Sequence, residues 1–171
     1  MTLMLAIAIV FGTLAFAAAT DVARRRIPNG LSIIVAACFL AAGVASPDRV
    51  DLLGGAWVGG AILIVGVVLF ALGKIGGGDV KLLAAMGLWA GPAAAMDFLL
   101  VTALAGGALA MFYLLPEINY LIGWMRAAIE RRAPALQGIE VQSNFRTHGL
   151  PYGVAIAAGG IFVLWTRYWP A

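Results

Sequence analysis

At 171 residues the chain has the length of one domain, yet 63% of its residues are hydrophobic and only 11% are charged. Soluble domains average about 25% charged residues, so this composition excludes an ordinary soluble protein and predicts that most of the chain lies in lipid. The formal net charge of +3 does not indicate a nucleic-acid partner, because in a membrane protein the distribution of charge matters more than its sum.

Six apolar runs are candidates for membrane-spanning helices, which need about 17 to 25 largely apolar residues. The fourth is interrupted by Gly91-Pro92 after ten residues, so it is expected to end at "WAGP", with the next helix beginning near Ala93. In chain order the runs are Leu3–Thr20, Leu31–Ala45, Leu52–Leu72, Leu82–Met96, Phe98–Leu115 and Leu150–Trp165. The expected fold is an all-α integral membrane protein of about six transmembrane helices, forming a single membrane-embedded domain over residues 1–171.

The basic residues indicate how these spans are oriented across the membrane. With the N-terminus outside, inner loops at about residues 21–30, 73–81 and 117–149 hold nine of the eleven Lys and Arg. This excess is what the positive-inside rule requires, so both termini are expected outside. Trp165, Tyr168 and Trp169 would then form an aromatic anchor at the outer interface. Apolar residues at helical spacing in the long inner loop predict an amphipathic helix lying on the membrane.

Glycine-rich and alanine-rich segments such as "GGAWVGG" place small residues where helices can approach closely in lipid. Met1–Thr20 lacks the basic segment that begins a signal peptide, so it is interpreted as an uncleaved first span. His148 has no second His or Cys nearby, which argues against a metal site.

Two acidic residues, Asp21 and Asp79, lie at the ends of apolar runs. Asp21 directly follows the first run, and Asp79 precedes the fourth. Because two crossings separate them, both are expected on the inner face at roughly the same depth. Two carboxylates close together share a proton, so the ionised one can draw a proton from water while the other donates to the attacked carbonyl. The sequence therefore predicts a paired-aspartate site.

Three glycines, Gly76 to Gly78, precede Asp79. Glycine can adopt positive φ and lets another chain approach closely, so an extended peptide is expected to lie against this turn. Irregular backbone at membrane depth beside an acid favours a functional site. Asp79 could equally serve as the N-cap of the fourth helix, a role that does not exclude catalysis. A phosphate loop is a poor interpretation, because "GGGDVK" lacks the GxxxxGK[ST] pattern.

Three segments resemble motifs of the type IV prepilin peptidases, which are GxGD-type membrane aspartic peptidases. "DVARRRIPN" is similar to the first motif, "GGGDVKLLAAMGLWAG" to the second, and "LPYGVAIAAGG" to the Pro-Tyr-Gly segment of the last helix. The three occur in the family's order, and the resemblance covers nearly the whole chain.

By position, the resemblance implies that Asp21 and Asp79 are the catalytic pair, with no metal and no organic cofactor. It implies substrate-binding or supporting roles for other residues of the motifs, namely Pro28, Asn29, Gly76, Gly78, Lys81, Pro151, Tyr152 and Gly153. The implied activity is removal of the leader peptide from type IV or Flp-type prepilins at the cytoplasmic face of the bacterial inner membrane. The implied partners are the prepilin and the lipid bilayer, with pilus assembly machinery as a further candidate and no nucleic acid.

Larger members of the family carry an N-terminal cytoplasmic region with paired cysteines, associated with methylation of the new pilin N-terminus. This chain starts at its first span and has one cysteine, Cys38, so it resembles the minimal, peptidase-only form of tight-adherence (Flp-type) pilus systems.

Two other functions are alternatives to a peptidase. A proton- or ion-coupled transporter would place its acids near the bilayer midplane and show two related halves. A non-catalytic subunit of a pilus machine would tolerate Asn at either aspartate.

Overall fold

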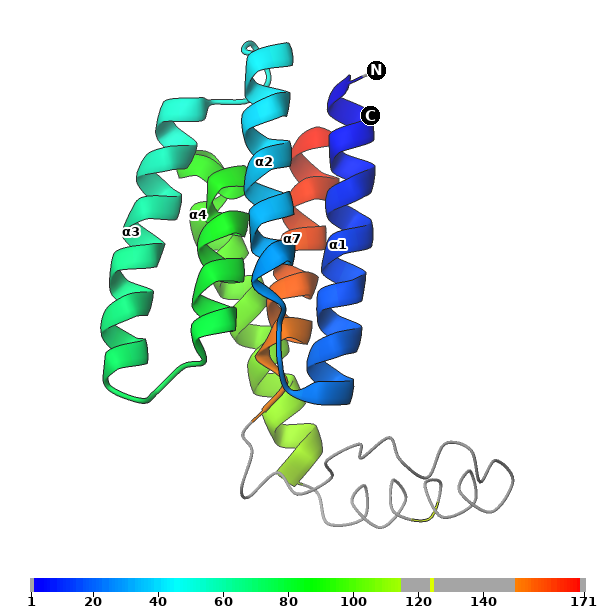
Figure 1. Cartoon of the computed structure of the whole chain (residues 1–171), viewed down its shortest axis with the longest axis vertical. Coiled ribbons are helices and arrows are strands. Elements are labelled where there is room, and N and C mark those ends of the chain that lie inside the picture. Colours follow the sequence, from blue (N-terminus) through cyan, green and yellow to red (C-terminus); the bar gives the residue numbers. More distant parts are fainter. Residues whose placement is uncertain (1, 115–123, 125–149, 170–171) are drawn as a thin grey trace.

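The computed structural model describes residues 2–114, 124 and 150–169, and these form a bundle of helices (Figure 1). Every regular element within this described part is a helix, which confirms the all-α prediction. The helices are α1 (Thr2–Arg24), α2 (Asn29–Ala45), α3 (Leu52–Ala71), α4 (Gly77–Leu114) and α7 (Tyr152–Tyr168). The amphipathic helix predicted in the loop 117–149, like His148, lies outside the described residues.

Three of these helices, α1, α3 and α4, are long and apolar enough to cross a membrane. The structure therefore agrees with a membrane protein but does not show six spans among the described residues. The fourth and fifth predicted runs are the two limbs of α4, on either side of a break at Gly91. The interruption itself was predicted correctly, since Gly91 has a non-helical conformation with φ 56° and ψ −176°. Figure 1 shows α4 turning back at this point, so that its two ends lie at the same end of the bundle.

Local chemistry causes the break in α4. Glycine tolerates the positive φ, and Pro92 lacks an N–H and disfavours a helical conformation in the residue before it. The break leaves the last carbonyls of the first limb of α4 (residues 77–90) without intrahelical donors. The end of α7 supplies these donors: Arg167 Nη1 donates to the carbonyl of Ala90 at 2.8 Å, and the Tyr168 hydroxyl donates to the carbonyl of Trp89 at 2.9 Å.

Tyr168 is therefore not part of an exposed aromatic anchor, as the sequence had suggested. Tyr168 is only 6% exposed, and its hydroxyl points into the bundle, where it donates to the carbonyl of Trp89. Trp165 and Trp169 remain exposed and stack on each other with ring centroids 4.7 Å apart. The predicted anchor is reduced to these two tryptophans.

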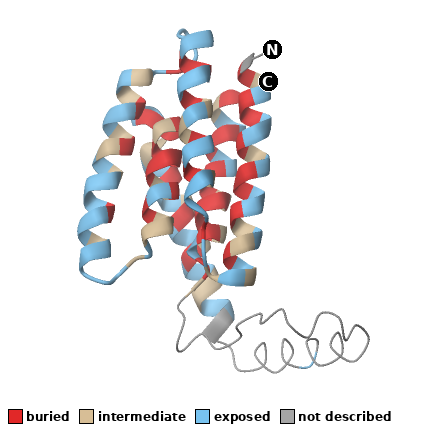
Figure 2. Ribbon diagram, in the orientation of Figure 1, coloured by how far each residue is buried: buried red, intermediate tan, exposed pale blue. Residues whose placement is uncertain are grey.

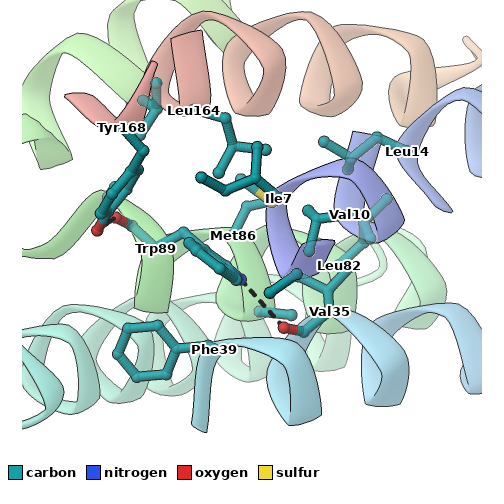
Figure 3. Close-up of a cluster of buried hydrophobic side chains, with 14 of the residues drawn as sticks. Ile7, Val10, Leu14, Val35, Phe39, Leu82, Met86, Trp89, Leu164 and Tyr168 are labelled. Carbon is teal, nitrogen blue, oxygen red and sulfur yellow. Dashed lines mark hydrogen bonds between the residues drawn. The ribbon is translucent and has the colours of Figure 1, made fainter. Parts of the chain in front are cut away.

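Trp89 lies at the centre of the buried core, which occupies the inner faces of α1, α2, α4 and α7 (Figure 2). Its indole N–H donates to the carbonyl of Val35 at 3.0 Å, and its ring packs edge-on against Phe39 and Tyr168 (Figure 3). A buried tryptophan needs such a partner for its N–H. Trp89 thus ties α2 and α7 to the first limb of α4, beside the break.

α3 lies at the edge of the bundle and packs mainly on α4. Glycines allow the close approach. As the "GGAWVGG" segment predicts, a Cβ atom on Gly59 would lie 2.5 Å from Leu88 Cδ2; Gly66, beyond that segment, acts in the same way, since a Cβ atom there would lie 2.6 Å from Val80 Cγ1. Most other side chains of α3 are exposed (Figure 2). The exposed face of α3 is therefore expected to contact lipid.

We expect Tyr168→Phe to lower the free energy of unfolding by about 1–3 kcal/mol, because the buried carbonyl of Trp89 loses its donor. Denaturant unfolding in detergent micelles would measure the change. Trp169→Phe alters a neighbouring exposed aromatic side chain and is expected to change stability by less than about 0.5 kcal/mol. Equal stabilities of the two variants would show that the Tyr168 hydroxyl does not support the break.

Candidate active site

Asp21 lies in the last turn of α1, which continues to Arg24 instead of ending at the aspartate. Its side chain is only 6% exposed, and Oδ2 accepts a hydrogen bond of 2.7 Å from the backbone N–H of Gly153. Gly153 is in the first turn of α7, where N–H groups have no intrahelical acceptor and the helix dipole favours a negative group. The start of α7 therefore both holds and stabilises the Asp21 carboxylate.

Ile27 sets the spacing of the helices around Asp21. α1 ends where Arg25 adopts a left-handed φ of 52°, and Pro28 prevents residue 27 from being helical. The buried Ile27 side chain then fills the space between two glycines. A Cβ atom on Gly78 would lie 3.2 Å from Ile27 Cβ, and one on Gly153 would lie 2.9 Å from Ile27 Cδ1. Sequence reasoning missed this role, which depends on contacts distant along the chain.

Asp79 is the third residue of α4 and not its N-cap, so the N-cap interpretation was wrong. The residue before the helix is Gly76, whose backbone N–H donates a hydrogen bond back to the Asp79 carboxylate. This is one half of a capping box, and it fixes the carboxylate over Gly76. A Cβ atom on Gly76 would lie 2.8 Å from Asp79 Oδ2.

The glycines before Asp79 provide close approach but not unusual backbone. Positive φ occurs at Gly73 and Gly91, and Gly76 to Gly78 do not adopt it. Gly73 has φ 67° and ends α3: its N–H donates to Phe70 O and the N–H of Lys74 donates to Leu69 O, both at 2.9 Å. This pattern is a Schellman motif, which explains why the positive φ falls there. The expectation of positive φ next to the aspartate was wrong.

Asp21 and Asp79 line the same cavity and are close enough to interact electrostatically. The cavity has a volume of about 640 Å³ and lies at the end of the bundle where α1 ends and α4 begins. Its walls are the end of α1 from Thr20, the loop 25–28, Asn29 and residues 76–79. The structure thus brings together two acids that are far apart in the sequence. This was predicted, because two membrane crossings between them return the chain to the same face.

Three arginines, Arg24 to Arg26, also line this cavity. The Arg25 guanidinium is close enough to Asp21 to interact electrostatically. From the sequence, the basic cluster is expected chiefly to mark the inner face, with binding of anionic lipid or orientation of substrate as further roles. The structure adds that these cations face the acids, so they contribute to the electrostatics of the site.

Most of the other predicted site residues lie in or beside the cavity. Pro28, Asn29, Gly76 and Gly78 line the cavity, and Gly153 holds Asp21. Lys81 lies beside the cavity, where its Nζ donates to Asn29 Oδ1 at 3.0 Å and joins α4 to α2. Pro151 and Tyr152 do not line the cavity. Pro151 is the residue before α7, and the Tyr152 ring lies against Gly106.

The arrangement provides two carboxylates, each oriented by a backbone N–H, facing a space large enough for water and a peptide. Within the described residues no three His, Cys, Asp or Glu side chains converge as a metal-binding group. A carboxylate pair of this kind can share a proton and carry out general acid–base hydrolysis of a carbonyl compound.

Comparison with known families agrees with this chemistry. Residues 8–111 match the type IV leader peptidase family. The match includes both aspartates and the glycine turn, and it stops before Pro151, Tyr152 and Gly153. Comparisons with curated proteins and with solved structures gave no match. Because the family match covers more than half of the chain, the protein belongs to the type IV leader peptidase family.

Proposed function

We propose that the protein is a membrane aspartic endopeptidase that removes the leader peptide from type IV or Flp-type prepilins. Membership of the leader peptidase family supports the reaction class and the substrate. The observation that carries the mechanism is the meeting of Asp21 and Asp79 in one cavity.

In the proposed mechanism a water molecule lies between the two carboxyl groups. The ionised carboxylate takes a proton from the water, whose oxygen attacks the carbonyl carbon of the scissile bond, while the protonated partner donates its proton to the carbonyl oxygen. The resulting tetrahedral intermediate collapses when the carboxyl group that took the water proton gives it to the nitrogen, and the C–N bond breaks. The partner carboxylate takes a proton back from a hydroxyl of the intermediate, which restores the carbonyl and the starting protonation states. The N–H groups of Gly153 and Gly76 would keep Asp21 and Asp79 in place throughout.

We further propose that the Asp21–Asp79 end of the bundle faces the cytoplasm of a bacterial inner membrane. Arg24 to Arg26, Lys74 and Lys81 lie at or beside this end, as the positive-inside rule requires of a cytoplasmic face. The beginning of α1 and the end of α7 lie at the opposite end (Figure 1), which would face outward. A prepilin would then reach the aspartates where its leader leaves the membrane.

Cleavage of a co-expressed prepilin in isolated membranes tests this function. We expect a shorter pilin band on a gel, with a new N-terminus identified by mass spectrometry at the boundary between the polar leader and the apolar segment. Membranes without the protein serve as the control. An intact prepilin in the presence of the correctly inserted protein would contradict the proposal. Proton or ion flux into liposomes containing the purified protein would instead favour a transporter.

A further inference from the structure

A groove separate from the aspartate cavity runs between α2 and α3, with α4 as its floor. It has a volume of about 640 Å³. α3 packs on α4 and has few contacts with α2, and the two helices diverge towards the Asp21–Asp79 end of the bundle (Figure 1). Small residues from all three helices line much of the groove, namely Ala36, Ala56, Gly59, Gly60, Ala84 and Ala85. We refer to this feature as the α2–α3 groove.

The α2–α3 groove adjoins the candidate active site. Asn29 lines both cavities, and Lys81, its hydrogen-bond partner, lines the groove. From Asn29 the groove follows one face of α2 through Ser32 to Ala36, a rise of about 10 Å along the helix axis. Since α3 and α4 are long and apolar enough to span a membrane, we expect the groove to lead from beside the aspartate cavity into the hydrocarbon region.

Ser32 indicates what kind of molecule the groove receives. Its side chain is only 7% exposed, it lines the groove, and its Oγ has no hydrogen-bond partner among the described residues. A buried hydroxyl without a partner is costly and uncommon, so a bound molecule that supplies a polar group would satisfy it. A lipid acyl chain has no such group. A polypeptide has a backbone carbonyl at every residue, and even within a helix the carbonyl oxygen keeps a second lone pair that can accept from the Ser32 hydroxyl.

We propose that the α2–α3 groove binds the apolar helical segment of the membrane-inserted substrate, on the carboxyl side of the scissile bond. The inference rests on the proposed peptidase function and adds to it the subsite that holds the substrate in lipid. The small lining residues let a helix approach the floor closely, as in helix–helix packing within membranes. With its N-terminal end at Asn29 and Lys81, such a helix directs the preceding peptide bond into the aspartate cavity.

Filling the groove tests the proposal. A Cβ atom on Gly60 or on Gly107 would meet nothing within 4 Å, but only Gly60 lines the groove. Gly60→Phe is expected to slow cleavage of a membrane-inserted prepilin about tenfold or more, corresponding to a loss of about 1.4 kcal/mol of binding. Gly107→Phe, the matched control, is expected to cleave it at the unmodified rate. Equal rates for the two variants would overturn the proposal.

Photo-crosslinking gives a second measurement that does not depend on rate. A photoreactive phenylalanine would replace Ile33, which lines the groove, or its neighbour Ile34, which is exposed on α2 and does not. An Asp79→Asn background keeps the prepilin uncleaved. We expect crosslinks to the prepilin from position 33 but not from position 34. Crosslinks from position 33 to lipid alone would overturn the groove assignment.

These experiments distinguish failure of the groove assignment from failure of the proposed function. If the unmodified protein cleaves the prepilin but position 33 does not crosslink to it, only the groove assignment is wrong. If the unmodified protein does not cleave the prepilin, the proposed function fails, and the groove assignment fails with it.

Discussion

Replacing either Asp21 or Asp79 by Asn is expected to lower the rate of prepilin cleavage by a factor of about 10² to 10⁴. Asparagine keeps the size and hydrogen-bonding shape of aspartate but can neither take a proton from water nor deliver one to the carbonyl oxygen. Each variant would be assayed in membranes by the gel shift of a co-expressed prepilin. Because the two carboxyl groups act on one water, the double variant is expected to be no slower than either single variant.

Asp97→Asn provides the matched control, because Asp97 is an exposed aspartate of α4 that does not line the cavity. Its rate of cleavage is expected to equal that of the unmodified protein. Membrane insertion and protein level would be compared for all variants. Normal cleavage by Asp21→Asn or Asp79→Asn would contradict the paired-aspartate mechanism. If membranes without the protein also cleave the prepilin, the result would favour a non-catalytic subunit of a pilus machine.

Gly153→Ala is expected to reduce cleavage about 100-fold, because the added methyl group displaces the Asp21 carboxylate. The new Cβ atom would lie 2.9 Å from Asp21 Oδ2 and 2.9 Å from Ile27 Cδ1, so neither side chain can keep its position. A displacement of about 1 Å at a reacting group can cost a factor of about 10² in rate. The initial rate of prepilin cleavage by purified protein in detergent would measure the effect.

Gly107→Ala is the corresponding control, because a Cβ atom there would meet no neighbouring atom within 4 Å. Unfolding of both variants in denaturant would separate a local displacement from a general loss of structure. A normal rate for Gly153→Ala would show that the Gly153 contact does not position Asp21 for the reaction.

The order of the spans and the chemistry of the backbone predicted the main features of the site. Asp21 and Asp79 were expected to meet because each lies at the end of an apolar run and two crossings separate them, and the structure places them in one cavity. The break at Gly91 was expected because glycine and proline impose it on the backbone without help from distant residues. Each of these expectations depends on chain order or backbone chemistry alone.

The sequence did not predict which face of each helix points into the bundle. In a soluble helix, apolar periodicity shows which face is buried, but a lipid-facing helix is apolar on all sides. The sequence therefore did not show that Tyr168 faces Trp89 or that Ser32 faces the α2–α3 groove. It also did not assign positive φ to Gly73 instead of Gly76, because several neighbouring glycines could have ended α3.

The role of α7 has a consequence for biosynthesis. The N–H of Gly153 holds an aspartate 132 positions earlier in the chain, and Arg167 and Tyr168 complete a helix end 77 and 79 positions earlier. A ribosome that has produced only α1 to α4 has therefore made both aspartates, but neither the support for Asp21 nor the donors for the break in α4. We therefore expect the nascent chain to acquire an ordered site only after α7 has been synthesised and packed against α1 and α4.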